Sequence, residues 1–380
     1  MERKSHSLIP TLRNALSSSA QLTERAIDLH AYANDASHFL LTPQAVAIPA
    51  NAAEVGSLLM ASAGLGLPLT FRSGGTSLSG QGVTDGLLVD VRKNFKDIEV
   101  LDSGMRVRVQ PGVTVRALNA RLALHGRKFG PDPASEIACT IGGVVANNSS
   151  GMHCGTVDNV YRTLESLVIV LASGTVIDTG ANDANQKLRA LEPEIFDGLE
   201  RLCRRVRQDA ESVATIKHQF SMKNTMGYGL NSFLDYEDPA QVLAHLIVGS
   251  EGTLGFVAEA TFRTVPVFKH VTTSLLVFDD LFTANESLES LVDSGAATVE
   301  LMDSLSLKVG QGLPGAPKIV RDLAVESHAA FLVEYTATSA PELAARQSTG
   351  LALARAPKRR APPPVTPAAP HRPPRGQRRP

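Results

Sequence analysis

Segments rich in glycine, serine and threonine are the parts of this sequence best suited to bind a ligand, because their short side chains leave backbone groups exposed. The first, residues 72 to 82, reads RSGGTSLSGQG and directly follows the strand-like segment LPLTF. A loop of short side chains lets successive N–H groups bind pyrophosphate oxygens, and Thr76, Ser77 and Ser79 add hydroxyl donors. The spacing is neither G-x-G-x-x-G nor G-x-x-x-x-G-K-[ST], so it predicts neither a Rossmann site nor a P-loop. A flexible glycine turn is the alternative interpretation of this loop taken alone.

Two further segments have the same character. Residues 130 to 155 read GPDPASEIACTIGGVVANNSSGMHCG, and residues 249 to 255 read GSEGTLG. The longer one has too much Gly, Asn, Ser and Pro for a long regular element, and an irregular stretch of that length within a domain is usually functional. Three such loops, each next to a predicted strand, are what a long nucleotide in an extended cleft requires.

The charge balance excludes a general nucleic-acid binder. The chain has 380 residues, 43% hydrophobic, with 37 Lys and Arg against 38 Asp and Glu. Residues 355 to 380 hold eight of the basic residues and no acidic one, so the rest of the chain is acidic and unsuited to polyanions. Nine prolines in the same segment predict a disordered tail. Its alternatives are a basic tail that binds RNA or acidic lipid, and an out-of-frame translation of a GC-rich gene.

The cysteines and the apolar segments indicate the compartment. Cys139, Cys154 and Cys203 share no C-x-x-C spacing and are odd in number, which argues against a disulfide scaffold, a zinc finger and an iron–sulfur cluster. We therefore expect a reducing, cytoplasmic location. No stretch approaches the roughly 18 apolar residues of a membrane span, and the N-terminus lacks the apolar core of a signal peptide. We expect a soluble chain, peripheral to a membrane at most.

The loops need strands and helices to position them, and hydrophobic periodicity predicts these elements. A helical lead-in and then a strand are expected before about residue 45. Apolar residues at helical intervals predict helices at residues 53–65, 113–125, 183–214 and 239–246. Apolar and β-branched runs predict strands at residues 67–71, 87–91, 105–109, 164–170, 175–179 and 259–267. At about Val267 the pattern resets, with TTSLLVFDDLF and ATVELMD flanking a helix, as a new domain would begin.

Motifs in a fixed order resemble a known family. RSGGTSLSG, PDPAS with TIGG and NNSSG, TMGYGLN, and GSEGTLG resemble the PCMH-type FAD-binding domain of flavoenzymes related to vanillyl-alcohol oxidase and para-cresol methylhydroxylase. Within that group the sequence is similar to the D-lactate, glycolate and D-2-hydroxyglutarate dehydrogenases, over roughly residues 43 to 303. The resemblance implies an α+β fold, in which a two-subdomain FAD-binding domain precedes an α+β cap domain with an antiparallel sheet. The expected domains are a helical lead-in at 1–42, the FAD-binding domain at 43–267, a truncated cap at 268–345 and a disordered basic tail at 346–380.

The resemblance also implies noncovalent FAD and assigns the residues that bind it. The first loop contributes Arg72, Ser73, Gly74, Gly75, Thr76, Ser77, Ser79 and Gly80. The second contributes Pro131, Asp132, Ser135, Thr140, Gly142, Gly143, Asn147 and Gly151, and the third contributes Glu251, Gly252, Gly255 and Val257. Some relatives tether the flavin through a histidine in the first loop, where this sequence has Thr76 and Ser77. Cys154, beside His153, is the alternative tether. The other interpretation of that cysteine is a buried, unreactive thiol.

The chemistry implied is oxidation of a D-2-hydroxy acid, such as D-lactate, glycolate or D-2-hydroxyglutarate, to the 2-oxo acid by hydride transfer to flavin. Such a reaction needs a cation to clamp the substrate carboxylate and a base for the hydroxyl proton. The catalytic candidates are Lys223 and Tyr228 in KNTMGYGLN, and Glu300 and Asp303 in VELMD. A surface turn and a solvated acidic face are the alternatives for these two pairs. By analogy alone, the electron acceptor is a quinone, a cytochrome or another flavoprotein.

The sequence departs from the family after Asp303. Relatives carry histidines and a carboxylate that hold a divalent metal in the cap, and larger relatives add an iron–sulfur half. His328 and His371 do not reproduce that histidine spacing, so we expect no metal. The alternative function is therefore a flavin-binding fragment without turnover. A third hypothesis, an interaction protein that binds nucleic acid, depends on the basic tail alone.

Overall fold

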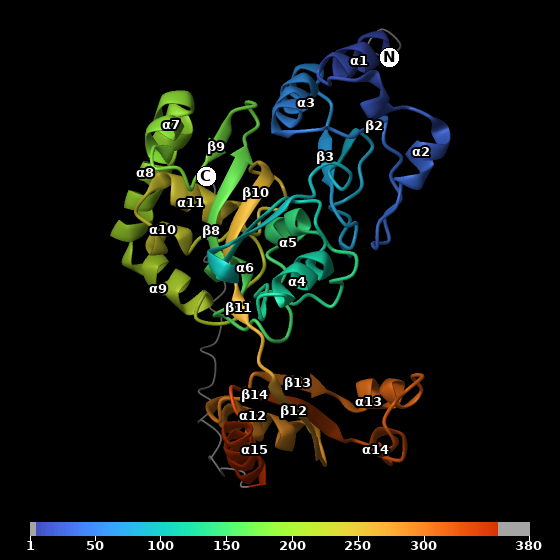
Figure 1. Ribbon diagram of the computed structural model, residues 1–380, viewed down its shortest axis with the longest axis vertical. Coiled ribbons are helices and arrows are strands. Elements are labelled where there is room, and N and C mark those ends of the chain that lie inside the picture. The colour runs from blue at the N-terminus through green and yellow to red at the C-terminus, as the bar shows by residue number, and fades with distance from the viewer. Residues whose placement is uncertain (1–4, 356–380) are drawn as a thin grey trace, which may run out of the picture. The chain divides into compact units, whose positions relative to one another are not determined.

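The computed structural model describes residues 5–355, so the disorder predicted for residues 356–380 lies outside the described part. The chain divides between Val267 and Phe268 into two compact units (Figure 1), and each has a hydrophobic core of its own. Both units combine helices and strands, which confirms the predicted α+β class. The truncation of the second unit stays a prediction.

A four-stranded sheet with the order β1-β2-β4-β3 builds the N-terminal part of the first unit. Its strands are β1 (Leu22–Thr23), β2 (Ala45–Ala47), β3 (Leu69–Arg72) and β4 (Leu87–Asp90). Both β2 and β3 run parallel to β4, and a parallel arrangement needs a crossover, which α3 (Ala52–Leu65) supplies. Asn51 accepts the amide of Glu54 to begin α3, and Gly66 ends it at a φ of 62°. The chain then passes through β3 directly into the first glycine-rich loop.

The N-terminal lead-in packs onto this sheet as part of the first unit. It contains α1 (Ser5–Asn14), η2 (Ser19–Gln21) and α2 (Ala26–Ala31). The buried carboxylate of Glu54 on α3 accepts the Ser17 amide at 3.1 Å and the Gln21 side-chain amide at 2.6 Å. Burial acts to raise the pKa of Glu54, but these bonds and one from the Ala50 amide outweigh it and lower the pKa. Glu54 therefore fastens the lead-in to α3.

A five-stranded antiparallel sheet with the order β5-β6-β10-β8-β9 builds the rest of the first unit. Its strands are β5 (Ile98–Leu101), β6 (Arg106–Val109), β8 (Leu164–Val170), β9 (Val176–Asp178) and β10 (Phe256–Arg263). The short strands β7 (Arg127–Lys128) and β11 (Val265–Pro266) pair separately. Sheet and helices share one core, in which Leu118, Leu167 and Phe262 are fully buried.

Helices surround this sheet. They are α4 (Val115–Ala123), α5 (Ile141–Asn147), α6 (Val160–Thr163), α7 (Ala184–Leu191), α8 (Pro193–Gln208), α9 (Ala210–Gln219), α10 (Ser232–Asp235) and α11 (Pro239–Ile247), with the short η3 (Asp102–Gly104). Figure 1 shows α7 to α11 gathered beside β8 and β9.

The structure differs from the predicted elements at several places in this unit, and the strands β5 and β7 were not predicted. The single helical region expected at residues 183–214 is three helices, because Pro193 begins α8 and the Asp209 side chain caps α9. The loop expected at residues 130 to 155 contains α5, since burial of Ile141 and Val144 outweighs the low helix propensity of the glycines.

The second unit is a three-stranded antiparallel sheet with helices on one face. Its elements are β12 (His270–Phe278), α12 (Leu281–Asp293), β13 (Thr298–Met302), α13 (Ser304–Gln311), α14 (Lys318–Arg321), β14 (Ala329–Ala337) and α15 (Ala340–Arg355). The sheet order is β12-β14-β13. Alternate residues Phe331, Val333 and Tyr335 of β14 are buried in the core beneath α12 and α15.

The tail expected from residue 346 conflicts with α15, which continues the helix to Arg355. The segment ELAARQSTGLALAR contains no proline and is rich in alanine and leucine, which favour a helix. The basic, proline-rich composition begins only after it.

Candidate functional site

A cleft of about 640 Å³ opens in the first unit, and all three glycine-rich loops line it. The volume lies within the range of roughly 300–1,000 Å³ that is usual for small-molecule and cofactor sites. Residues from β3, α5 and the start of β10 complete its walls. Among the described residues on these walls, Glu251 is the one with a formal charge and none is Lys or Arg. An anionic ligand would therefore be held by backbone N–H groups and hydroxyls.

Most of the predicted cofactor residues meet at this cleft. Those on its wall are Ser73, Gly74, Gly75, Thr76, Ser77, Ser79, Ser135, Thr140, Gly142, Gly143, Asn147, Glu251, Gly252, Gly255 and Val257. The others, which do not line it, are Arg72, Gly80, Pro131, Asp132 and Gly151.

Arg72 lies beneath the first loop rather than in the cleft, so its assignment as a ligand contact is a prediction that the geometry does not support. Its guanidinium is buried and donates to the carbonyl of Gly82 at 2.6 Å and to that of Asn34. A Cβ at Gly75, where φ is +68°, would lie 2.8 Å from Arg72 Nε. Burial lowers the pKa of Arg72, which nearby Asp35 opposes. Arg72 therefore supports the backbone of the first loop. The sequence does not show whether an arginine next to a glycine-rich loop points into the cleft or packs behind the loop.

The first and second loops touch backbone to backbone. A Cβ at Gly74 would lie 2.4 Å from the carbonyl oxygen of Ala138 and 2.8 Å from Cys139 Cα, so only glycine fits. The Ser73 hydroxyl accepts the Gly143 amide at 3.0 Å and also bonds the Thr140 hydroxyl. The start of α5 is thus fixed to the first loop, and residues of both line the same space.

The third loop is hydrogen-bonded to the end of α5. Amides of Gly249 and Glu251 donate to Val145 and Ala146 carbonyls at 3.0 and 2.8 Å. The Asn147 side-chain amide donates to the Glu251 carboxylate at 2.8 Å. Partial burial raises the pKa of Glu251, although the bond from Asn147 opposes this. The three loops therefore form one connected wall.

The remaining loop residues serve other contacts. A Cβ at Gly80 would lie 2.5 Å from the Phe39 ring, and one at Gly151 would lie 2.3 Å from the Asp132 carbonyl oxygen. Asp132 instead binds His153, with 2.6 Å between Oδ2 and the imidazole Nδ1. At both positions, glycine lets another segment of the same chain approach closely.

The catalytic candidates are divided between the two units. Lys223 Nζ donates to the Gly151 carbonyl at 2.7 Å, and the Tyr228 hydroxyl bonds the Thr253 hydroxyl at 2.8 Å beside the cleft. Glu300 is exposed on β13 of the second unit. Asp303 caps α13 by accepting the Ser306 amide at 2.7 Å, and its hydrogen bonds to Ser306 lower its pKa. The geometry thus gives Asp303 a structural task and leaves Lys223, Tyr228 and Glu300 as candidates.

The structure adds a polar cluster that the sequence analysis missed. Asp132, His153 and Lys223 all meet at Gly151, and Lys223 and Asp132 both act on the pKa of Cys154, which burial raises. These residues are too far apart along the chain for spacing to bring them together. The sequence analysis named Asp132, His153 and Lys223 separately, and nothing in it placed them together.

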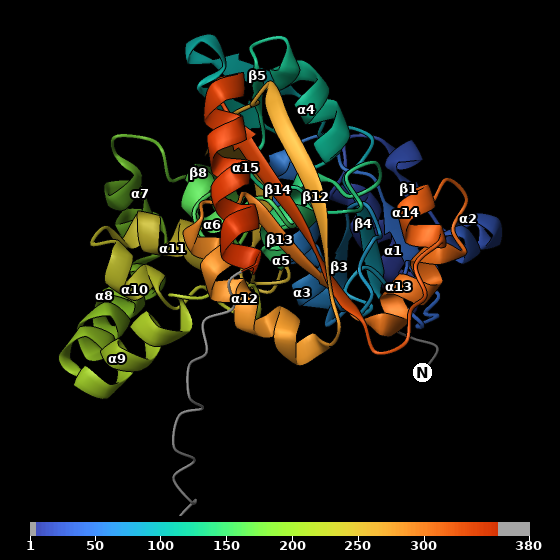
Figure 2. The ribbon, with the colours of Figure 1, turned by 90° about the horizontal axis from the view of Figure 1, so that it is seen from below.

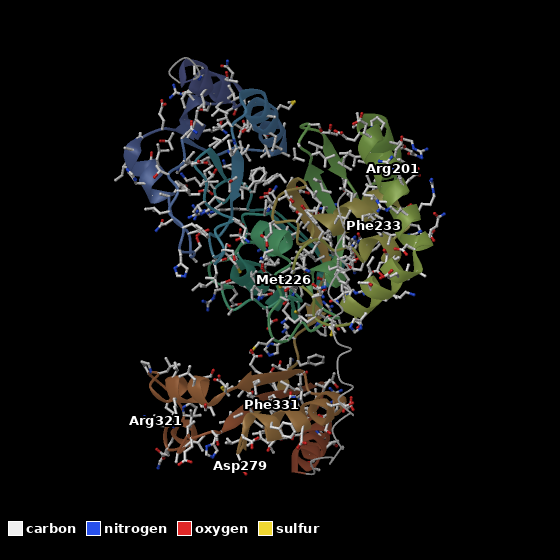
Figure 3. The ribbon with its side chains drawn as sticks, turned by 180° about the vertical axis from the view of Figure 1, so that it is seen from behind. Arg201, Met226, Phe233, Asp279, Arg321 and Phe331 are labelled. Carbon is white, nitrogen blue, oxygen red and sulfur yellow. The ribbon has the colours of Figure 1, made fainter. Side chains whose placement is uncertain are left out.

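A second buried network supports the segment KNTMGYGLN from behind. Tyr161 donates to Asp235 at 3.0 Å, and Tyr236 bonds Nε2 of His245 at 2.8 Å. A Cβ at Gly229 would lie 3.0 Å from the His245 carbonyl and 3.3 Å from the Tyr161 ring. The segment is therefore held against rigid aromatic side chains, while its Met226 is 87% exposed (Figure 3).

The described residues 5–355 contain no cluster of three or more His, Cys, Asp or Glu side chains able to hold a metal ion. No helix in the same range combines the length and apolar character that a bilayer crossing requires. Cys139, Cys154 and Cys203 are buried and free.

Comparison with known proteins identifies the cleft. Residues 43–180 match the FAD binding domain family, so this part of the chain is an FAD-binding domain and FAD is its cofactor. The match covers the first loop and the second, which supply most of the cleft wall.

Curated relatives align with a larger part of the chain. A D-2-hydroxyglutarate dehydrogenase of Haemophilus influenzae is 26% identical over 73% of this chain and 28% of its own length. A D-lactate dehydrogenase of Archaeoglobus fulgidus is 27% identical over 77% of this chain and 56% of its own length. The glycolate oxidase subunit GlcD of Escherichia coli is 27% identical over 71% of this chain and 44% of its own length. The chain thus spans between about a quarter and just over half of the length of these relatives.

A solved structure shares the fold. An alkyldihydroxyacetonephosphate synthase superposes with a TM-score of 0.63 at 15% identity, over 91% of this chain and 60% of that one.

The residues present fit FAD. The buried hydroxyl of Ser250 lines the cleft and has no hydrogen-bond partner among the described residues, so it is available to a ligand. A Cβ at Gly252 would meet nothing within 4 Å, which leaves open space beside the third loop. A wall of amides and hydroxyls without Lys or Arg among its described residues suits a diphosphate between two ring systems.

Proposed function

We propose that the chain oxidises a small D-2-hydroxy acid, of the D-lactate, glycolate or D-2-hydroxyglutarate type, to the 2-oxo acid with noncovalently bound FAD. The observation that carries the proposal is the continuous wall of three loops around one cleft. Similarity to three enzymes named for such substrates, over 71–77% of this chain, supports the choice of substrate class. We also propose a cytoplasmic location, which the three free cysteines support.

The three loops hold the cofactor without cationic side chains. Residues of the first loop and of the start of α5 line the same space, and Thr76 and Ser77 lie on the same wall. Bound FAD supplies the acceptor for the hydride from the substrate carbon. Thr76 and Ser77 stand where some relatives have a tethering histidine, and Cys154 does not line the cleft, which supports noncovalent binding.

The polar cluster at Gly151 is the proposed substrate-binding group. The Lys223 ammonium would bind the substrate carboxylate, because it is exposed and it donates to a neutral carbonyl, that of Gly151. Asp132 orients the His153 imidazole through Nδ1, which suits His153 to accept the hydroxyl proton. Tyr228 would hold the adjoining wall through Thr253.

Anaerobic spectroscopy tests this function. The FAD-loaded chain is mixed with D-lactate, glycolate or D-2-hydroxyglutarate, and the oxidised flavin bands are expected to bleach with one of these acids. Bands that persist with all three would instead establish the alternative, a flavin-binding chain without turnover. A chain that takes up no FAD in excess would contradict the cofactor site as well.

Variants then separate the roles of the cluster. Replacing Lys223 by Met is expected to raise the substrate concentration needed for bleaching, whereas Lys223→Arg should restore part of the affinity. Lys187→Met is the control, because Lys187 pairs with Asp183 on the surface of α7. Replacing His153 by Ala should slow bleaching, and an unchanged rate would remove His153 from the mechanism.

A further inference from the structure

A second cavity, of about 500 Å³, lies in the first unit and shares no lining residue with the FAD cleft. Its volume is within the range of roughly 300–1,000 Å³ that is usual for small-molecule sites. One face of the five-stranded sheet forms one side, and the segment between β9 and α7 forms another together with the start of α11. Figure 2 shows α7 and α11 side by side there, where α7 contacts β9 and α11 contacts β8.

Alternation along the strands gives the sheet side of the second cavity its polar character. In the RVRV sequence of β6, the two valines are buried in the core and the two arginines are exposed. Thr261 of β10 lies directly opposite Arg108 of β6 and opposite Ser166 of β8. Directly opposite residues of antiparallel strands share a face, and all three line the cavity. The sheet therefore presents a row of polar side chains to it.

The middle residue of this row has an unused hydroxyl. Thr261 is only 7% exposed, and its hydroxyl has no hydrogen-bond partner among the described residues. Thr179, which also lines the cavity and is equally buried, differs because its hydroxyl accepts the Leu167 amide at 2.8 Å. Since a buried hydroxyl without a partner is costly, the Thr261 hydroxyl is available to a ligand.

The helix side of the second cavity contributes both donors and acceptors. Asp238 precedes α11, where its exposed carboxylate makes no cap and so can accept bonds from a ligand. The Asn185 side-chain oxygen accepts the Ala240 amide at 3.0 Å, which leaves its NH₂ group to donate. The Gln241 side-chain amide donates to the Thr179 carbonyl at 3.1 Å and so fixes α11 to the end of β9.

The charges around the second cavity balance one another. Among its described lining residues, Arg106 and Arg108 are matched by Glu165 and Asp238. Arg106 donates to Glu165 at 3.3 Å and to Asp102 at 2.5 Å, so its charge is already neutralised. The lining is therefore suited to a neutral ligand.

Arg108 keeps free N–H groups but is a poor site for an anion. It lies 3.8 Å from Glu99 and 3.9 Å from Glu259, and both distances are too long for a hydrogen bond. A phosphate or carboxylate bound to Arg108 would therefore lie next to two carboxylates, which would repel it. A ligand hydroxyl can accept the same N–H groups without that repulsion.

We propose that the second cavity binds a small neutral polyol of the monosaccharide type. Each hydroxyl both donates and accepts, which matches a lining that mixes guanidinium, amide, hydroxyl and carboxylate groups. Ligand hydroxyls would accept from Arg108 and Asn185, bond the Thr261 hydroxyl, and donate to Asp238. None of the described lining residues is aromatic, so the cavity offers no ring on which a flat ligand could stack.

Saturation-transfer NMR of the full-length FAD-loaded chain with D-glucose tests the proposal, because bound FAD fills the other cleft. We expect a dissociation constant on the order of 1 mM, as is usual for so small a ligand. Thr261→Val should weaken binding about tenfold, since it removes the hydroxyl and keeps the shape of the side chain. Asp238→Ala should also weaken it, and this exposed position does not affect folding through a cap.

Thr298→Val is the matched control. Thr298 is likewise a buried strand threonine whose hydroxyl has no partner, but it belongs to the second unit and lines neither cavity. Its replacement should leave D-glucose binding unchanged. Circular dichroism of the variants distinguishes weaker binding from loss of the fold.

Four results would overturn the proposal. They are the absence of saturation transfer across a millimolar series of D-glucose, binding that Thr261→Val and Asp238→Ala leave unchanged, tighter binding of glycine or inorganic phosphate than of D-glucose, and flavin bleaching by D-glucose. The last would place the sugar in the FAD cleft. Because the titration uses no 2-hydroxy acid, its outcome is independent of the oxidation proposed above.

Discussion

The contact between the first and second loops gives a sharp test of the cofactor site, through Gly74→Ala. The new Cβ would lie 2.4 Å from the Ala138 carbonyl oxygen, and both partners are backbone, so the two loops must move apart. Overpacking of this kind costs about 1–3 kcal/mol. The free protein relieves the overlap by separating the loops, whereas FAD requires them in place. The same energy therefore opposes binding, and the dissociation constant for FAD should rise roughly 5- to 150-fold.

Titration of the apo-protein with FAD, followed by flavin fluorescence, measures this change. Gly143→Ala is an intermediate variant, because its Cβ would lie 3.1 Å from the hydroxyl of Ser73, a side chain that can rotate. Gly64→Ala is the control, since nothing lies within 4 Å of its Cβ and it is exposed on α3. Gly74→Ala with the affinity of the original chain would refute the close contact of the loops as the basis of the site. Circular dichroism of each apo-protein distinguishes weak binding from loss of the fold.

Three other outcomes follow from the structure. Arg72→Met should lower the free energy of unfolding by roughly 2–3 kcal/mol and weaken FAD binding. Arg72→Lys should restore little, because one ammonium cannot replace the guanidinium that bonds Gly82 and Asn34. Chemical denaturation measures the first effect, and FAD titration measures the second. Burial lowers the pKa of His245 to about 4 from its ordinary 6.5, so between these pH values only the unfolded chain binds the proton. The free energy of unfolding should therefore be highest above about pH 6.5 and fall by about 3 kcal/mol toward pH 4. Melting curves of His245→Gln should lack this pH dependence. Acid precipitation should release all the flavin into the supernatant from both the original chain and Cys154→Ser, and a yellow pellet from the original chain would contradict noncovalent binding.

The sequence predicted the cleft because its chemistry belongs to the backbone. Runs of glycine and serine indicate exposed amides and so predicted an extended cleft, whereas the resemblance to a known family is what assigned Ser73, Thr140 and Glu251 to one site. The helix α5 within the second loop was missed, because its glycines mask the buried face of Ile141 and Val144.

Side-chain roles were harder to predict than backbone ones. Arg72 has a side chain suited to binding an anion. Only its hydrogen bonds to Gly82 and Asn34 show that the guanidinium faces away from the cleft. The pair of Asp132 and His153 depends on a turn of the chain that residue spacing does not define. Asp303 was singled out for its motif, whereas its position before α13 makes it a helix cap.

The wall of the cleft is assembled from segments more than a hundred residues apart in the sequence. Binding of the coloured flavin therefore depends on correct folding of the first unit. Residues 72–82 and 249–255 are both hydrogen-bonded to α5, so the cleft forms only once these distant segments have come together in the native topology. A ligand that binds the native state alone stabilises it by mass action. Flavin absorbance of this chain would therefore count correctly folded molecules, and excess FAD during refolding would increase their yield.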